Sequence, residues 1–339
     1  MHEDCTGARM RFTASAVGLS LVVMVGCTKS PTDPSGASTV FQGQTVSAID
    51  GSPRPNLSVR IGTQHATTDS NGLFEVDLGE NGTYRVFVRG NEIVERETQV
   101  TGPNGSRARL SVIPASYDLT AFNEMFRSLN SRLVRWTSRP SLVLLATVMD
   151  YRGSAESYEA TGEQMSDDEV AQMVLHYTEG LALLTGNTYT TFENVEIERP
   201  AAGTRVSPFR AGKIVVGRYT GIANIAKTIG YGQWGEMPDG TIASGANFLD
   251  RDFDKNDSRR RLLRTHELGH ALGYQHVESR VSIMNPAVGP EPNDFDRAGA
   301  MIAFQRPVGN RAPDVDPGSS NGFLVSTGEP RWSAPTVCR

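Results

Sequence analysis

The chain has 339 residues, of which 38% are hydrophobic and 21% are charged, so it can form packed cores and is not a disordered chain. Its formal net charge of −5 provides no electrostatic basis for binding nucleic acid, and we expect no nucleic-acid partner. The three cysteines are too few for a scaffold held together by disulfides, and the length predicts about two domains.

The N-terminal segment 1–27 has the order of a secretory signal peptide. Basic residues precede an uncharged apolar run that is shorter than a typical transmembrane helix, and this run ends at Cys27. The sequence "MVGC" at this point resembles the lipobox of bacterial lipoproteins, in which the cysteine carries the lipid. The resemblance implies a membrane anchor at Cys27 and a location in the bacterial cell envelope, at the outer membrane or facing the periplasm. An ordinary signal peptide with an incidental Cys27 is the alternative, and it would give a secreted protein.

Residues 28–38 are rich in Pro, Ser and Thr and are expected to form a linker, after which strand patterns follow over 39–114. The segments "LSVRI", "LFEVDL" and "TYRVFVRG" have the alternation of strands, and turn sequences such as "TDSNG" separate them. This pattern predicts a small antiparallel β-sandwich. The sequences "GQTVSAIDGSPRPNLSVRI", "TTDSNGLFEV" and "GTYRVFVRG" resemble the carboxypeptidase regulatory-like (transthyretin-like) domains of secreted proteins. That resemblance implies a spacer or binding role for this segment.

Helical and strand patterns alternate over 115–308, which predicts a second domain of α/β (α+β) class. Apolar residues at helical spacing predict a helix that follows Asp118. The continuous apolar run "SLVLLATVM" predicts a strand buried on both faces. Ser166 and Glu169 form the capping-box signature of a helix over 166–185. The segments "GKIVVGRYTG", "IGYGQWGE" and "GTIASGANFLD" are the next strand patterns.

Three of the six histidines fall within the stretch "RTHELGHALGYQHVESRVSIMNP". A helix that starts near Asn256 or Asp257 would place His266 and His270 one turn apart on the same face, where both imidazoles can bind one Zn²⁺. Glu267 directly follows the first of these ligands and is positioned to hold a water at the metal.

A catalytic zinc site needs a third protein ligand. His276 lies six residues after His270 and would point away from it on a continuous helix. Gly273 accepts a positive φ angle, so the helix can end there and the chain can bring His276 back to the metal.

The complete motif, His266-Glu267-x-x-His270-x-x-Gly273-x-x-His276, is similar to the extended zinc motif of the metzincin metallopeptidases. The resemblance implies one catalytic Zn²⁺ held by the three histidines, with Glu267 as the catalytic base. Metzincins also have a methionine-containing turn, and "SIMNP" supplies Met284. By resemblance, Met284 forms an apolar floor below the metal without binding it.

The same resemblance has implications for the fold and for substrate binding. It implies a metzincin-type zinc peptidase domain over 115–308, in which "IGYGQWGE" is the edge strand that holds an extended substrate. The residues after the methionine would form the wall of a pocket for a substrate side chain, namely Asn285, Pro286, Ala287 and Val288.

These features predict a zinc-dependent endopeptidase of metzincin type, which acts on a peptide or protein substrate through a water activated by the metal, with Glu267 as general base. Two alternatives stay open. A lipid-anchored binding or adhesion protein would have a structural zinc site, although such sites usually have four protein ligands and no adjacent base. A zinc hydrolase acting on a non-protein amide would share the motif, and substrate profiling separates it from a peptidase.

Two further segments carry weaker signals. The acidic stretch "DRDFDKND" resembles a calcium-binding loop, but Lys255 stands where an EF-hand needs glycine and Arg261 where it needs its closing glutamate. We therefore favour a solvated loop that leads into a helix cap over a Ca²⁺ site. Residues 309–339 are rich in Pro and Gly and are expected to be a tail that follows the second domain.

Overall fold

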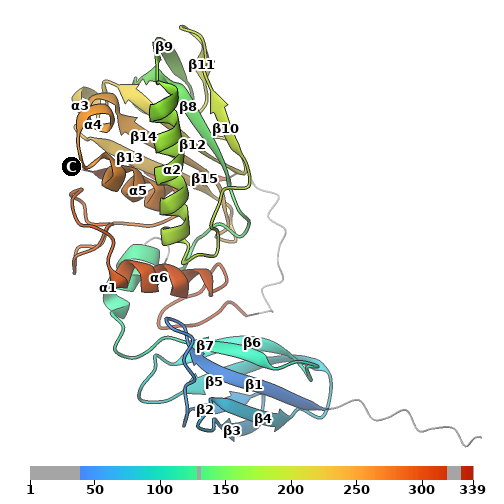
Figure 1. Ribbon diagram of the computed structural model, residues 1–339. Helices are drawn as coiled ribbons and strands as arrows, with labels where there is room; N and C mark the ends of the chain where they lie inside the picture. The colour runs from blue at the N-terminus through green and yellow to red at the C-terminus, as the bar shows by residue number, and fades with distance from the viewer. Residues whose placement is uncertain (1–38, 128–130, 319–329, 339) are drawn as a thin grey trace, which may run out of the picture. The chain divides into compact units, whose positions relative to one another are not determined.

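The computed structural model describes residues 39–127, 131–318 and 330–338 (Figure 1). The predicted signal peptide, the lipid anchor at Cys27 and the linker over 28–38 lie outside the described residues, so these stay predictions. Among the residues that are described, no helix is both long enough and apolar enough to cross a membrane.

Residues 40–112 form two small sheets around a common apolar core. One sheet has three strands in the order β4-β1-β7, and the other has four in the order β3-β2-β5-β6. The strands are β1 (Val40–Ser47), β2 (Ser58–Ile61), β3 (Gln64–Thr67), β4 (Leu73–Asp77), β5 (Gly82–Arg89), β6 (Arg96–Gly102) and β7 (Ala108–Val112). Their core includes Phe41, Val59, Ile61, Val86, Val88 and Leu110. The predicted sandwich is wrong in one respect, because β7 pairs parallel to β1 while the other pairs are antiparallel.

The remaining strands form one nine-stranded mixed sheet with the order β11-β9-β8-β12-β14-β13-β15, in which β10 also pairs with β8 and β16 with β13. The strands are β8 (Ser141–Asp150), β9 (Tyr158–Gln164), β10 (Val195–Glu198), β11 (Arg205–Val206), β12 (Lys213–Thr220), β13 (Gly230–Glu236), β14 (Ile242–Asp250), β15 (Arg331–Trp332) and β16 (Thr336–Cys338). β8, β10, β12 and β14 pair in parallel, whereas β13 runs antiparallel to β14. β8 is buried along nearly its whole length, as its apolar run predicts.

The helices of the described residues are α1 (Leu119–Arg127), α2 (Asp167–Leu184), α3 (Ile222–Ile225), α4 (Arg251–Asn256), α5 (Arg260–Ala271) and α6 (Asp294–Phe304). The capping box predicted at the start of α2 is confirmed, because the side chain of Ser166 accepts from Glu169 N and the carboxylate of Glu169 accepts from Ser166 N. The helix predicted to start near Asn256 is instead divided. Asp250 caps α4, and α5 begins after Arg259 without a side-chain cap.

The prediction of a metzincin-type α/β (α+β) fold is wrong for this chain. Of the described residues, 35% lie in strands and 21% in helices, and the large sheet is curled like half of a barrel. The helix predicted after Asp118 is found as α1, which comprises nine described residues. The segment 309–339, which the sequence predicts as a tail, instead contributes the two strands β15 and β16 to the large sheet.

Residues 310–316 are also held in place by buried ionic contacts. The carboxylate of Asp314 is fully buried and accepts hydrogen bonds from Arg306 Nε at 2.8 Å and from Arg96 Nη1 at 3.0 Å. Burial opposes the ionised form, but the two guanidinium groups outweigh it and lower the pKa of Asp314. The start of the predicted tail is therefore bound to β6 and to the end of α6.

Candidate metal centre

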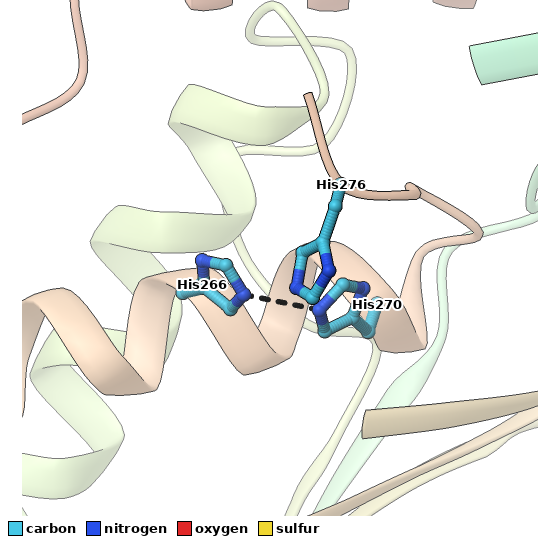
Figure 2. Close-up of side chains that lie close together, drawn as sticks. All are labelled: His266, His270 and His276. Atoms are coloured by element: carbon cyan, nitrogen blue, oxygen red, sulfur yellow. Dashed lines mark hydrogen bonds between the residues drawn. The ribbon is translucent and has the colours of Figure 1, made fainter. Parts of the chain in front are cut away.

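The three histidines of the motif lie together in the structure, as the spacing predicts (Figure 2). α5 carries His266 and His270 one turn apart, with 4.7 Å between the ring centroids. The ring of His276 lies 5.3 Å from that of His266 and 4.9 Å from that of His270. One ligand nitrogen from each ring lies within 4.8 Å of the other two. Within the part of the chain that the structure describes, no other group of three potential metal ligands is this close.

Gly273 makes this convergence possible. Its φ angle is +98°, and a Cβ atom there would lie 2.6 Å from Cδ1 of Ile242 and 3.1 Å from Cγ2 of Val134. α5 ends at this point, where Gly273 N donates to His270 O at 2.9 Å. The chain then turns back and carries His276 to the other two histidines, which confirms the prediction made for Gly273.

The hydrogen bonds of the two helical histidines fix which ring nitrogen faces the centre. His266 Nδ1 donates to the carbonyl of Ile283 at 2.6 Å, and His270 Nδ1 donates to the carbonyl of Tyr274 at 2.8 Å. A carbonyl oxygen can only accept, so each Nδ1 carries the hydrogen. Burial lowers the pKa of His266 to about 3 and that of His270 well below its ordinary value, so both rings are neutral at pH 7. Each Nε2 therefore has a lone pair directed away from its carbonyl partner.

The donor set fits a divalent zinc ion. The Nε2 atoms of His266 and His270 lie 3.0 Å apart, and in these tautomers neither of them has a hydrogen to give to the other (Figure 2). Two lone pairs at this separation repel unless a cation lies between them. Neutral imidazoles whose Nδ1–H is held by a backbone carbonyl are the usual ligands of Zn²⁺, and three protein ligands are the usual number in a catalytic site. His266, His270 and His276 are the residues that would hold the ion.

Glu267 is fully buried on the same turn of α5, and β13 passes directly beside it. A Cβ atom on Gly230 would lie 2.9 Å from Oε1 of Glu267, and one on Gly232 would lie 2.6 Å from Cβ of His270. Asn247 donates from Nδ2 to the backbone carbonyl of Glu267 at 2.5 Å. The absence of side chains on the two glycines thus lets β13 lie against the turn of α5 that carries Glu267. The prediction that this strand is the edge of the sheet is wrong, because β15 and β16 pair with its other side.

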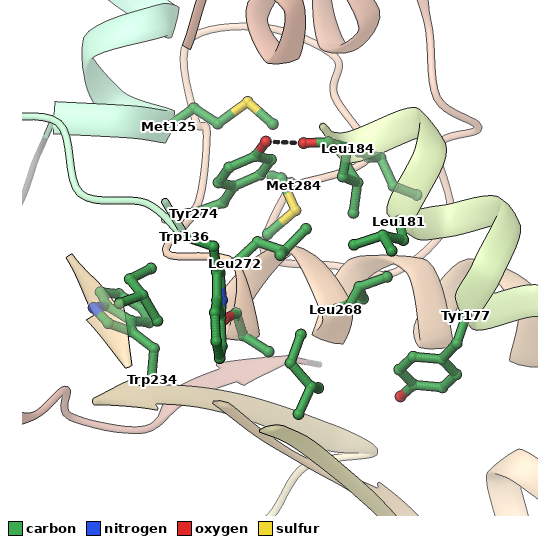
Figure 3. Packing of buried hydrophobic residues seen from close by; sticks show 14 of the residues in the cluster. Met125, Trp136, Tyr177, Leu181, Leu184, Trp234, Leu268, Leu272, Tyr274 and Met284 are labelled. Atoms are coloured by element: carbon green, nitrogen blue, oxygen red, sulfur yellow. Dashed lines mark hydrogen bonds between the residues drawn. The ribbon is translucent and has the colours of Figure 1, made fainter. Parts of the chain in front are cut away.

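Met284, predicted to form an apolar floor below the metal, packs against α5 at Gly269, between His266 and His270. It is fully buried, and a Cβ atom on Gly269 would lie 2.5 Å from its sulfur. Figure 3 shows Met284 within the apolar cluster that surrounds the end of α5, together with Tyr274 and Leu184. In the same cluster, the hydroxyl of Tyr274 donates to Leu184 O.

The sequence did not reveal that Asp296 supports this turn. The carboxylate of Asp296 accepts from Ser282 Oγ at 2.5 Å and from Ile283 N at 3.2 Å, while the Ile283 carbonyl holds His266. Asp296 is 1% exposed and also accepts from Asn293 N in the capping box of α6. The spacing of Asn293 and Asp296 is a capping-box signal in the sequence, but nothing local shows that the carboxylate also reaches the turn.

The four residues predicted to line the substrate pocket follow Met284 on the same loop. The amide group of Asn285 is used within this loop, where it donates to the carbonyls of Val277 at 2.6 Å and Arg280 at 2.8 Å. Val288 is buried, Pro286 is half-buried and Ala287 is exposed. The pocket assignment itself stays a prediction.

The acidic stretch that resembles a calcium loop does not gather its carboxylates at one point. Asp250 caps α4, and Asp252 pairs with Arg251. Asp254 is fully buried, so the prediction of a solvated loop is wrong for this residue. Its carboxylate accepts from Arg264 and Arg218, each at 2.7 Å.

Comparison with known proteins adds little to these observations. No protein-family profile and no curated protein matches the chain. A type II cohesin–X-dockerin complex from Acetivibrio cellulolyticus is 26% identical over 22% of this chain and 55% of that chain, with a TM-score of 0.18. A proposed carbohydrate-binding protein from Bacteroides uniformis is 14% identical over 37% of this chain and 53% of that chain, with a TM-score of 0.20. The chain thus spans about half the length of each, and TM-scores this low support no conclusion about fold or function.

Proposed function

We propose that this protein is a zinc-dependent endopeptidase. The observation that carries the proposal is the convergence of three imidazoles on one point, with their ligand atoms within 4.8 Å, next to a buried glutamate on the same helix. Structural zinc sites usually have four protein ligands and no adjacent base, whereas three ligands beside a carboxylate are typical of a hydrolase. The similarity of the motif to that of the metzincin peptidases supports the same activity.

When bound, Zn²⁺ would lower the pKa of a water ligand toward 7 and polarise the carbonyl group under attack. Glu267 supplies the base. One of its carboxylate oxygens takes a proton from the attacking water, and the carboxyl group then gives this proton to the nitrogen of the departing amine. The carbonyls of Ile283 and Tyr274 keep the two helical imidazoles in the orientation and tautomer that the ion requires.

A polypeptide is the substrate that best fits the surroundings of Glu267. β13 lies against α5 at Gly230 and Gly232, so a chain that pairs with the outer edge of β13 runs past the base. An extended peptide binds such an edge through main-chain hydrogen bonds, which depend little on its side chains. A small amide that is not a peptide could not form this pairing.

The proposal is tested by incubating the zinc-loaded full chain with a mixed peptide library, in parallel with Glu267→Gln. We expect cleavage by the native chain and a loss on the order of 10³-fold in the variant, because removal of a general base typically costs 10²- to 10⁴-fold. The exposed Glu278, which lies close in sequence, gives the matched control Glu278→Gln, and its rate should not change. Equal zinc content in all three proteins is checked by elemental analysis. Equal cleavage by Glu267→Gln, or cleavage of non-peptide amides alone, would contradict the proposal.

A further inference from the structure

The outer edge of β13 is occupied by the C-terminal segment of the chain itself. β15 pairs antiparallel with β13, with Trp332 opposite Gly235 and Arg331 opposite Glu236. β16 continues this pairing along the same edge, with Thr336 opposite Gly232 and Cys338 opposite Gly230. We call residues 330–338 the C-terminal segment. It extends along β13 from one end to the other.

Specific hydrogen bonds hold the middle of the segment, between its two short strands. Ser333 N donates to Trp234 O at 2.8 Å, and Trp234 N donates to Ser333 Oγ at 3.2 Å. The side chain of Gln233 donates to Ser333 O at 3.0 Å. Both backbone polar groups of Trp234 are thus satisfied by the segment, as they would be by a strand added to a sheet edge.

Several side chains in residues 331–335 of the segment are exposed. The ring of Trp332 packs on that of Phe209 with 4.1 Å between centroids, yet Trp332 remains 37% exposed. Arg331, Ala334 and Pro335 are exposed as well. Main-chain pairing and the contact of Trp332 with Phe209 thus attach the segment, while Arg331, Ala334 and Pro335 add little buried surface.

The segment follows the path that a substrate would take. It runs antiparallel to β13, toward the end at which Gly230 lies beside Oε1 of Glu267. A peptide paired with this edge in the same direction needs the same Trp234 N–H and C=O groups that Ser333 uses. The segment and such a peptide cannot be bound at the same time.

We propose that the C-terminal segment is an intramolecular competitor that occupies the substrate edge of β13 and keeps the site in a state of low activity. Its effect on hydrolysis rests on the proposed peptidase function, whereas its position on β13 does not. A tethered segment has an effective concentration on the order of 1 mM, so one with a Kd of about 0.1 mM would be bound roughly nine-tenths of the time. Release should therefore raise the rate of peptide cleavage by about tenfold.

The occupied edge is tested without reference to activity by hydrogen exchange of residues 230–236. The full chain is compared with a chain that ends at Glu329 and with the full-length variant Ser333→Pro, which lacks the N–H that bonds to Trp234 O. We expect faster exchange in both altered proteins, and restored protection when a peptide of residues 330–338 is added to the shortened chain. Ala334→Pro is the matched control, because Ala334 N makes no hydrogen bond among the described residues. Unchanged exchange in both altered proteins would overturn the proposal.

Cleavage by the same proteins separates the two proposals. If the shortened chain and Ser333→Pro cleave about tenfold faster than the full chain, and the added peptide inhibits competitively while a scrambled peptide does not, the segment is an inhibitor. If exchange changes but all forms cleave at the same rate, the inhibitory role is wrong. If exchange changes and no zinc-loaded form cleaves any peptide, the position of the segment stands and the peptidase proposal falls. Should the shortened chain fail to fold, as judged by circular dichroism, the Ser333→Pro variant decides.

Discussion

The carboxylate of Asp296 accepts a hydrogen bond from the backbone of Ile283, and Ile283 in turn helps to position His266. Ile283 N donates to Asp296 at 3.2 Å, and the carbonyl of Ile283 accepts from His266 Nδ1 at 2.6 Å. These two hydrogen bonds connect the first turn of α6 to the proposed zinc site. Asp296 itself is buried, with an exposed fraction of 1%. Substitution of a residue that orients a metal ligand in this way commonly weakens metal binding by 10- to 100-fold.

Asp296→Asn should therefore weaken zinc binding by roughly 10- to 100-fold. The amide keeps the size of the side chain but accepts the hydrogen bonds of Ser282 and Ile283 without a charge, so the turn below His266 is held less firmly. Zinc affinity is measured by competition with a chelator, and folding stability by thermal unfolding. Asn293→Ala is the control, because it removes the cap of α6 and the bond from Asn293 Nδ2 to Val281 O but leaves the contacts of Asp296 with Ser282 and Ile283. A loss of stability equal to that of the control, with zinc affinity unchanged, would show that Asp296 acts only on the helix.

Gly273→Ala should lower both stability and zinc affinity. The φ angle of +98° is strained for any residue with a Cβ atom, and that atom would lie 2.6 Å from Cδ1 of Ile242. We expect a loss of about 1–3 kcal/mol in the free energy of unfolding, together with weaker zinc binding because His276 is displaced. Gly289→Ala is the matched control, since nothing lies within 4 Å of its Cβ position and its φ angle is not in the left-handed region. Native zinc affinity in Gly273→Ala would contradict the role assigned to this glycine.

The sequence predicts the part of the site that depends on local geometry. The spacing of His266 and His270 on a helix, the turn at Gly273 and the return of His276 all follow from backbone rules that act over a few residues. The structure confirms that these three histidines lie together. The capping box at Ser166 and the strand over "IGYGQWGE" are likewise local signals, and both are found. The predicted position of that strand at the edge of the sheet is wrong, because β15 and β16 pair with it.

The sequence does not predict the features that depend on distant partners. The pairing of residues 331–338 with β13 joins segments about a hundred residues apart in the chain, and no turn or periodicity marks it. The burial of Asp254 depends on Arg264 and Arg218, which lie 10 and 36 residues away and are marked by no local pattern. The predicted fold class is wrong for a related reason. Apolar spacing indicates a helix over a few turns, but it does not indicate how many strands join a sheet.

Asp254→Asn should destabilise the fold strongly. The carboxylate of Asp254 is fully buried and lies between two buried guanidinium groups, those of Arg264 on α5 and Arg218 on β12. Loss of its charge leaves these cations without their main counter-ion, and breaking a buried pair in this way costs about 3–5 kcal/mol. Chemical denaturation measures the change. Asp252→Asn alters a surface pair whose carboxylate side chain is 74% exposed, and it should cost less than about 1 kcal/mol. Equal effects of the two substitutions would show that the buried network contributes no more than a surface contact.

The stability of the protein in acid should depend on Glu169. Burial favours its neutral form, but hydrogen bonds from Arg218 and from the Ser166 N–H outweigh this effect and lower the pKa of Glu169 to about 2. Because the pKa in the folded state lies below that of the unfolded chain, the stabilisation is fully present above about pH 4.5 and is lost as the pH falls toward about 2. The side chain of Glu169 is 30% exposed, so solvent screening reduces the contribution to about 1–2 kcal/mol.

The free energy of unfolding, measured from about pH 5 down to about pH 2.5, should therefore fall more steeply for the native chain than for Glu169→Gln. Gln cannot lose a charge over this range, so the difference between the two curves isolates the ionisation of Glu169. Asp168→Asn, which changes a neighbouring exposed carboxylate, should follow the native curve. If Glu169→Gln lost stability in acid as steeply as the native chain, the ionisation of Glu169 beside Arg218 would not be the cause of the acid sensitivity. The sensitivity would then come from other buried carboxylates such as Asp314, whose pKa is also lowered.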